Sequence, residues 1–387
     1  MKKGRKEARP SRAKSKTPSA APVGGWWATR KPLVRFTLAF FGFIAAFFAL
    51  SFAPFWIQLE QKFLLLNAQS ENALLNLLGQ GCQVSGTSIS SAHFAIAVQP
   101  QCCAVELIAF LCAALLAFPS PLVRKVAGML LGIVAIALLN MVRIVSVFLI
   151  GAHLPSFFQA VHEELWPGLI TLATLLLILA WIRWVLRSED KAQKSKRHAP
   201  FFAVRFAVVF CLLIISWPKE SAWCGYALRG LGTMAFTRAQ GQREVTFEPL
   251  DYHNTRVVIV NRGLMDKDGA GPVRNLDFNS CGLLWRPLCL LFALIFATPL
   301  TIRRQLLSLA IGGYLLLGLL LIALGFSIWN ESSEVSLVIL SPFWKNFANH
   351  LQIALVQLAT LVAPVFIWLW AVFPRLHQLS QKGAPSK

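Results

Sequence analysis

Long runs of apolar residues alternate with short polar segments along most of this chain. A helix needs roughly 20 mostly apolar residues to cross a bilayer, because the hydrocarbon layer is about 30 Å thick and each residue rises about 1.5 Å. Eight runs reach or approach this length, and they span residues 36–56, 103–123, 126–150, 165–184, 201–217, 283–300, 306–329 and 351–373. The pattern therefore predicts an all-α polytopic membrane protein with about eight transmembrane helices.

The sizeable polar interruption covers residues 218–282. Within it, residues 244–261 contain β-branched and aromatic runs around a polar break, a pattern that predicts a hairpin or a small sheet. The whole chain is expected to divide into a basic tail (1–35), a first transmembrane region (36–187), a basic linker (188–200) and a second transmembrane region (201–387) that contains the polar segment.

The composition indicates a lipid environment and excludes an ordinary soluble protein. The chain is 56% hydrophobic and only 14% charged, with a mean hydropathy of +0.59. Its formal net charge is +20, and many of the cations lie in residues 1–35. A strongly basic chain is typical of nucleic-acid binding, but no RNA- or DNA-reading motif accompanies these cations. We therefore expect membrane lipids as partners, and no nucleic acid.

The distribution of Lys and Arg predicts which side of the membrane each loop faces, because short cytoplasmic loops are enriched in these residues. With a cytoplasmic amino terminus, every inside segment is basic, namely 1–35, 124–125, 187–198, 303–304 and the carboxy-terminal end. The short segments between the helices on the other side carry few cations. Both termini are therefore expected in the cytoplasm, and residues 218–282 outside.

Arg143 is a charged residue deep inside a predicted span, and such residues usually mark function. Asn140 and Ser146 share roughly one helix face with it. Cys102 and His162 precede predicted spans at the same outer face. A thiol at a helix amino terminus, an imidazole and a guanidinium together can perform cysteine acyl transfer. The alternatives are an Arg143 that reaches the lipid headgroups and a solvated His162.

The cysteines allow further interpretations. Cys102 or Cys103 could pair with Cys82 in a disulfide bond instead of acting as a nucleophile. Cys224 and Cys281 bracket the external polar segment, so we expect a disulfide bond between them in an oxidising compartment. No cysteine or histidine spacing typical of zinc occurs, and neither a metal nor a cofactor is expected.

Three motifs in order resemble the exosortase and archaeosortase family. The first motif is Gln101-Cys102-Cys103-Ala104-Val105-Glu106, preceded by a loop in which residues 81–84 and 94–98 also resemble the family. The second motif is Asn140-Met141-Val142-Arg143-Ile144, and the third is Val161-His162-Glu163 with Gly168. They match the family's nucleophile motif, its Asn-x-x-Arg helix motif and its His motif. The resemblance covers about residues 36–184, so residues 36–187 would be the catalytic core.

The resemblance implies a membrane-embedded cysteine protease and transpeptidase of the cell inner membrane. Such enzymes act on exported proteins of the PEP-CTERM type, whose carboxy-terminal signal joins a short motif, a transmembrane helix and a basic tail. Cys102 would be the nucleophile, His162 the proton-transfer residue, and Arg143 the group that stabilises the oxyanion. Asn140 and Glu106 would support them.

This sequence departs from the family pattern at two positions. Ala104 replaces the usual Gly, and Cys103 occupies the small-residue position, which makes Cys103 the alternative nucleophile. His153 is the alternative base. The sequence also leaves other functions open, namely a transporter or export component for a small molecule or lipid-linked glycan, and a membrane scaffold. Arg286, near a predicted helix end, is expected to reach the lipid headgroups.

Overall fold

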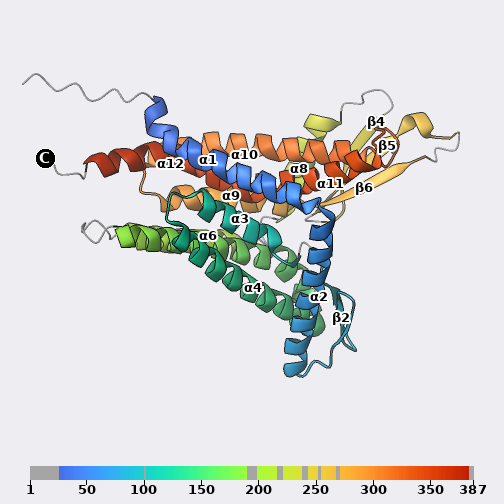
Figure 1. Cartoon of the computed structure of the whole chain (residues 1–387). Coiled ribbons are helices and arrows are strands. Elements are labelled where there is room, and N and C mark those ends of the chain that lie inside the picture. Colours follow the sequence, from blue (N-terminus) through green and yellow to red (C-terminus); the bar gives the residue numbers. More distant parts are fainter. Residues whose placement is uncertain are drawn as a thin grey trace, which may run out of the picture.

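The computed structural model describes residues 26–99, 102–189, 198–215, 221–237, 243–251, 254–266 and 271–382. These residues form a helical bundle with two small sheets at one end (Figure 1). Helix α1 begins and α12 ends at the opposite end of the bundle. The predicted all-α membrane class is confirmed. Most of the basic tail and of the linker 188–200 lies outside the described residues.

The bundle contains most of the predicted spans. Its helices are α1 (Trp26–Ser51), α3 (Val105–Ala117), α4 (Leu122–His153), α6 (Trp166–Glu189), α7 (His198–Ile215), α9 (Ser280–Ala297), α10 (Ile302–Glu331), α11 (Pro342–Gln357) and α12 (Ala363–Lys382). Across the described ranges, six helical stretches are long and apolar enough to cross a membrane. The apolar helices in α3 and α7 are shorter. The protein is therefore a multi-pass membrane protein, but a count of eight spans is not confirmed.

Two helices lie where the sequence predicted none. Helix α2 (Pro54–Leu77) stands at an angle to the bundle (Figure 1), and α8 (Ser221–Phe236) occupies part of the external polar segment. The buried residues of α2 are Leu64, Ala68, Glu71 and Leu75. Their spacing of four, three and four residues places them on one helix face. Helix α2 is therefore an amphipathic helix that packs through one side.

Both sheets are antiparallel and three-stranded. The first consists of β1 (Gln83–Ser85), β2 (Ser88–Ser90) and β3 (Ala95–Ala97), in that order. The second consists of β4 (Arg243–Pro249), β5 (Asn254–Asn261) and β6 (Val273–Asn279). Strands β4 and β5 are the hairpin that the sequence predicted, and β6 pairs with the other edge of β5.

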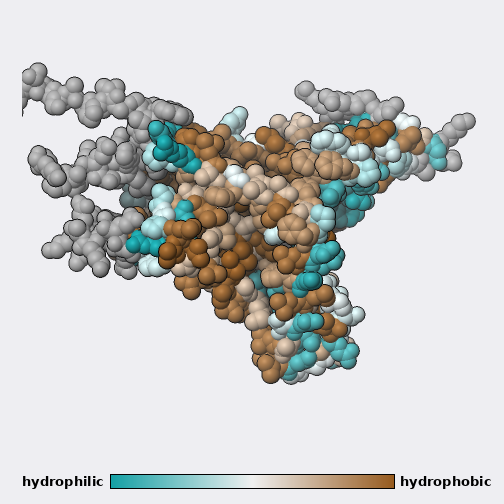
Figure 2. Space-filling model, in the orientation of Figure 1, coloured by the Kyte–Doolittle hydropathy of each residue, from teal (hydrophilic) through white to brown (hydrophobic). Residues whose placement is uncertain are grey.

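The two halves of the chain, residues 26–189 and 198–382, share a hydrophobic core. Phe40 and Phe110 from the first half pack with Phe206, Leu290 and Phe366 from the second. The ring centroids of Phe40 and Phe366 are 4.8 Å apart. Apolar side chains also cover the visible outer surface of the bundle, whereas hydrophilic residues gather at its ends (Figure 2). Burial of aromatic surface in the shared core, as between Phe40 and Phe366, therefore fixes how the second half packs against the first.

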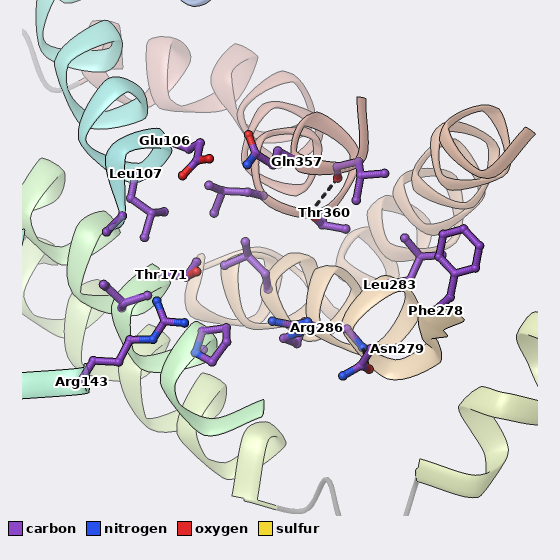
Figure 3. Close-up of a pocket in the computed structure, with 18 of the residues that line it drawn as sticks. Glu106, Leu107, Arg143, Thr171, Phe278, Asn279, Leu283, Arg286, Gln357 and Thr360 are labelled. Atoms are coloured by element: carbon purple, nitrogen blue, oxygen red, sulfur yellow. Dashed lines mark hydrogen bonds between the residues drawn. The ribbon is translucent and has the colours of Figure 1, made fainter. Parts of the chain in front are cut away.

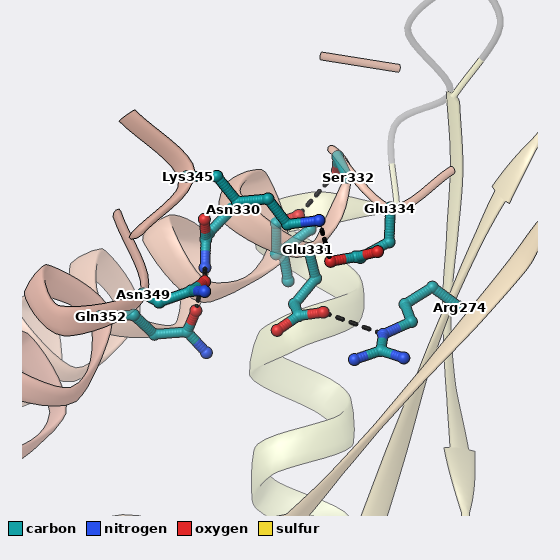
Figure 4. A network of polar contacts seen from close by, with 9 residues as sticks. Arg274, Asn330, Glu331, Ser332, Glu334, Lys345, Asn349 and Gln352 are labelled. Atoms are coloured by element: carbon teal, nitrogen blue, oxygen red, sulfur yellow. Dashed lines mark hydrogen bonds and ion pairs between the residues drawn. The ribbon is translucent and has the colours of Figure 1, made fainter. Parts of the chain in front are cut away.

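A polar network holds the second sheet against the ends of α10 and α11 (Figure 4). Arg274 on β6 pairs with Glu331 at 2.9 Å, and the α11 residue Lys345 pairs with Glu334 at 2.7 Å. Asn330 is buried and donates to Asn349 and Gln352 on α11. The strand that leads into α9 is therefore attached to the bundle.

Candidate active site

A cavity of about 290 Å³ brings together the three residues that the sequence predicted as catalytic. Its walls include Cys102, Arg143 and His162. The remaining lining residues come from β3 and the residues after it, from α4 and from α5 (Pro155–Gln159), and they are Ala95, Ile96, Ala97, Val98, Gln99, Ile144, Val147 and Phe158. Side chains about 60 residues apart in sequence therefore meet at the sheet end of the bundle.

Cys102 lies in a turn that joins the first sheet to α3. Its backbone N–H donates to the Gln99 carbonyl at 2.8 Å, and its side chain is half-buried. Ala104, which follows, has a left-handed backbone conformation with φ of 54°. This conformation turns the chain into α3 directly after the two cysteines. Cys102 therefore lies just before the amino terminus of α3.

Cys103 has different surroundings. Its side chain is only 3% exposed, packs in the same apolar cluster as Cys82, and contacts the Gln99 carbonyl. Burial raises the pKa of Cys103 to about 12, and the neighbouring Glu71 carboxylate adds to this effect. Both Cys82 and Cys103 are free thiols. A buried thiol of high pKa is a poor nucleophile, and Cys103 does not line the cavity.

Arg143 lies on α4 with its guanidinium close enough to Cys102 and His162 to interact electrostatically with both. Within the described ranges, no hydrogen bond or ion pair engages this guanidinium. A half-buried cation with open donors can bind a developing oxyanion. Asn140, predicted to support Arg143, is buried, and its amide has no hydrogen-bond partner among the described residues. A supporting role for Asn140 stays a prediction.

His162 lies on a short π-helix, η2 (Ala160–Leu165), between α5 (Pro155–Gln159) and α6. Its ring stacks on Phe158 with the centroids 5.4 Å apart. Such π-helical turns are rare and are found frequently at functional sites. The alternative base, His153, is exposed, and its ring contacts Gln80 instead of the cavity.

Glu163, the neighbour of His162, connects this π-helix to the second half of the chain. The amide of Asn279 donates to Glu163 at 3.1 Å. Asn279 also caps α9, because its side-chain oxygen accepts from the N–H of Gly282 at 2.6 Å. The second half therefore contacts the segment that holds His162, a connection that the sequence did not reveal.

Phe94 fixes the position of the first sheet beside the cavity. Its ring packs edge-on against Phe148 of α4 and Phe158 of α5, with centroid distances of 5.5 and 5.3 Å. Gly151 leaves the space for this ring, since a Cβ atom there would overlap it. The loop before β3 is thus locked between two helices.

A second cavity, of about 430 Å³, shares Arg143 with the first one and lies between the two halves (Figure 3). Glu106 reaches it from α3 and hydrogen-bonds Gln357. Arg286 enters from α9, where the absence of a Cβ at Gly282 lets the guanidinium lie over the first helical turn. The expectation that Arg286 reaches lipid headgroups is therefore wrong. An arginine inside a span could have signalled this second site.

The structure also bears on the expected disulfide bond. Cys224 and Cys281 are both fully buried and pack in one small cluster with Trp285. Cys224 is a thiol in this structure. The packing brings the two residues together, and the disulfide bond stays a prediction.

Comparison with known proteins gives one family. The sequence model described as "Transmembrane exosortase (Exosortase_EpsH)" matches residues 23–181, which include Cys102, Arg143 and His162. No curated protein and no solved structure matches the chain. The matched part ends inside α6, so residues 182–387 lie outside the match. Residues 23–181 of this chain are therefore similar to the transmembrane exosortase family.

Proposed function

We propose that this protein is a membrane cysteine transpeptidase and protease that cleaves carboxy-terminal sorting signals of exported proteins. The observation that carries the proposal is the single cavity lined by Cys102, Arg143 and His162. The family match to residues 23–181 supports the same class of enzyme. The substrates would be exported proteins whose signal joins a short motif, a transmembrane helix and a basic tail.

The first half-reaction would form a thioester. The Cys102 thiolate attacks the carbonyl carbon of the scissile peptide bond, and the oxygen gains a negative charge that Arg143 stabilises. The bond to the leaving nitrogen then breaks as protonated His162 gives its proton to the departing amine. The upstream part of the substrate stays joined to Cys102.

The second half-reaction would release the product. An acceptor nucleophile attacks the thioester carbon while His162 takes the proton of the acceptor, and the thiolate of Cys102 leaves. Water as the acceptor gives hydrolysis, whereas an amine or hydroxyl gives transfer. We place these steps at the outer face of a cell inner membrane, with both termini in the cytoplasm. The basic loops support this orientation.

A processing assay tests the proposal. Candidate exported proteins with the tripartite signal are co-expressed with the full-length protein, and cleavage is followed by the change in substrate mass. Cys102→Ala should abolish cleavage, whereas the matched variant Cys103→Ala should retain it. A stalled substrate should remain joined to the enzyme through a bond that hydroxylamine breaks. If Cys102→Ala and the double variant still process the substrate, the cysteine enzyme assignment is wrong.

A further inference from the structure

Strand β3 has one open edge. Among the residues that the structure describes, it pairs with β2 on one side only, in the order β1-β2-β3. The N–H of Val98 donates to the Thr87 carbonyl at 2.9 Å, and the Phe94 carbonyl accepts from Ser91 at 2.8 Å. Backbone groups alternate in direction along an antiparallel strand. The N–H and C=O groups of Ala95 and Ala97 therefore point away from β2.

This open edge borders the cavity that contains Cys102. Five consecutive residues, from Ala95 to Gln99, line that cavity. A strand that faced the cavity with one side of the sheet would line it with every second residue. Because consecutive residues line it, the backbone of this segment forms part of the cavity wall. The edge also leads directly to the nucleophile, because the carbonyl of Gln99 accepts the N–H of Cys102 at 2.8 Å.

The side chains along this edge leave it accessible. Ala95 and Ala97 are exposed and small, whereas Ile96 packs against the apolar cluster behind the sheet. Exposed strand edges are templates for a further strand, because their N–H and C=O groups need partners at a strand's spacing. A polypeptide in extended conformation supplies that alternation of donors and acceptors.

We propose that the open edge of β3 binds the substrate as an added β-strand. An extended segment of the sorting signal hydrogen-bonds to Ala95 and Ala97 and thereby brings its scissile carbonyl to Cys102. This inference rests on the proposed function and adds the mode of substrate binding. Main-chain pairing gives affinity for any extended sequence, so specificity comes from other contacts.

Proline variants of the full-length protein test the edge. Ala97→Pro removes an outward N–H that the sheet does not use, and edge strands tolerate proline at such positions. Val84→Pro is the matched control, because the register of β1 with β2 directs its N–H to the opposite edge of the sheet. The probe is a reporter with a sorting signal that wild type cleaves and Cys102→Ala does not.

We expect Ala97→Pro to lower kcat/KM about tenfold through KM, as befits one lost hydrogen bond. Val84→Pro should stay within about threefold of wild type. In the wild-type enzyme, ester bonds that replace single substrate amides should weaken binding at every second position. The alternation should persist in Ala97→Pro at a higher KM, because the proline removes a β3 N–H that donates to a substrate carbonyl, whereas each ester removes a substrate N–H that donates to a β3 carbonyl. A merely structural role of Ala97 would not produce the alternation.

Other outcomes separate this inference from the enzyme assignment. Equal kcat/KM for Ala97→Pro and wild type overturns the added strand and leaves the Cys102 chemistry standing. If Ala97→Pro abolishes a cross-linkable dimer and leaves the kinetics unchanged, the edge joins two copies of the chain and the proposal is wrong. If Ala97→Pro does not accumulate in membranes, the ester scan on wild type decides. Cleavage by Cys102→Ala would refute the enzyme assignment instead.

Discussion

Ala104 occupies a position at which a side chain is unfavourable. Its φ of 54° lies in the left-handed region, and its side chain is buried. Left-handed backbone costs an L-residue with a Cβ roughly 1–2 kcal/mol, which glycine avoids. The structure thus gives a physical reason for the glycine that the family motif usually has here. The chain accepts the strain at the turn that presents Cys102.

We expect Ala104→Gly to raise the free energy of unfolding by about 0.5–1 kcal/mol, the relief of strain less the added freedom of the unfolded chain. Cleavage should be retained, because the turn keeps its shape. Ala104→Val should have the opposite effect on stability. Thermal unfolding in detergent, followed by size-exclusion fluorescence, measures both. A lower midpoint for Ala104→Gly would contradict this reading.

Arg143 should not be replaceable by another cation. Arg143→Lys keeps the charge, but an ammonium cannot reproduce the planar fork of guanidinium donors. We expect cleavage to slow about a hundredfold, the size of effect seen when an oxyanion donor is removed. The control is Arg205→Lys, at an exposed position on α7. Rate constants from single-turnover cleavage decide, and near-wild-type chemistry in Arg143→Lys would remove Arg143 from the reaction.

At the scale of elements, α2 contains a buried carboxyl group. Glu71 is fully buried on the face that includes Ala68 and Leu75, and neither carboxylate oxygen has a hydrogen-bond partner among the described residues. Burial raises the pKa of Glu71 from 4.5 to about 7. Between these values, the folded state holds a proton that the unfolded state releases.

The free energy of unfolding should therefore fall as pH rises from about 4.5 to about 7, by about 3 kcal/mol from this group. Glu71→Gln should remove that part of the pH dependence and should stabilise the protein most above pH 7. Melting midpoints of both proteins across this range check the prediction. Parallel curves for wild type and Glu71→Gln would show that Glu71 does not titrate there.

Several elements could be predicted from the sequence, and others could not. The long apolar runs predicted the spanning helices because a bilayer imposes both length and composition. Helix α2 was missed because its mixed polar and apolar residues resemble a loop in a search for apolar runs. The first sheet was missed because strands of three residues are too short to show alternation.

The candidate site was predictable only in part. Cys102, Arg143 and His162 could be grouped because the topology predicted from the sequence puts all three near one membrane face, and one cavity is lined by all three. The positions of Asn279 and Arg286 beside the site could not be predicted, because they depend on how the two halves of the chain pack through aromatic side chains. No local spacing records such a contact. The position of a residue along a helix can thus be predicted from the sequence, whereas contacts between the two halves of the chain can be identified only from the structure.

At the scale of the whole molecule, Asn279 connects the second half to Glu163, the neighbour of His162. Asn279→Ser should keep the cap of α9, since serine caps helices well, but its side chain is too short to reach Glu163. Stability should change by less than about 0.5 kcal/mol. Cleavage should slow about tenfold, because the π-helix loses a tether and small misplacements of reacting groups are costly.

Asn279→Asp provides the comparison for this coupling. It keeps both the cap and the reach, but it sets a second carboxylate against Glu163. Its cleavage should be at least as slow as that of Asn279→Ser. Wild-type rates in both variants, measured with equal amounts of protein in membranes, would mean that the second half does not position His162.

Helix α4 is longer than the membrane it crosses. Its 32 residues extend over about 48 Å, against a hydrocarbon layer of about 30 Å. Such a helix tilts, or the lipids around it stretch. The depth of Arg143 in the bilayer thus depends on acyl-chain length. In vesicles made from lipids of increasing acyl-chain length, the rate of substrate cleavage should pass through a maximum. Bilayer thickness would then regulate the proposed activity.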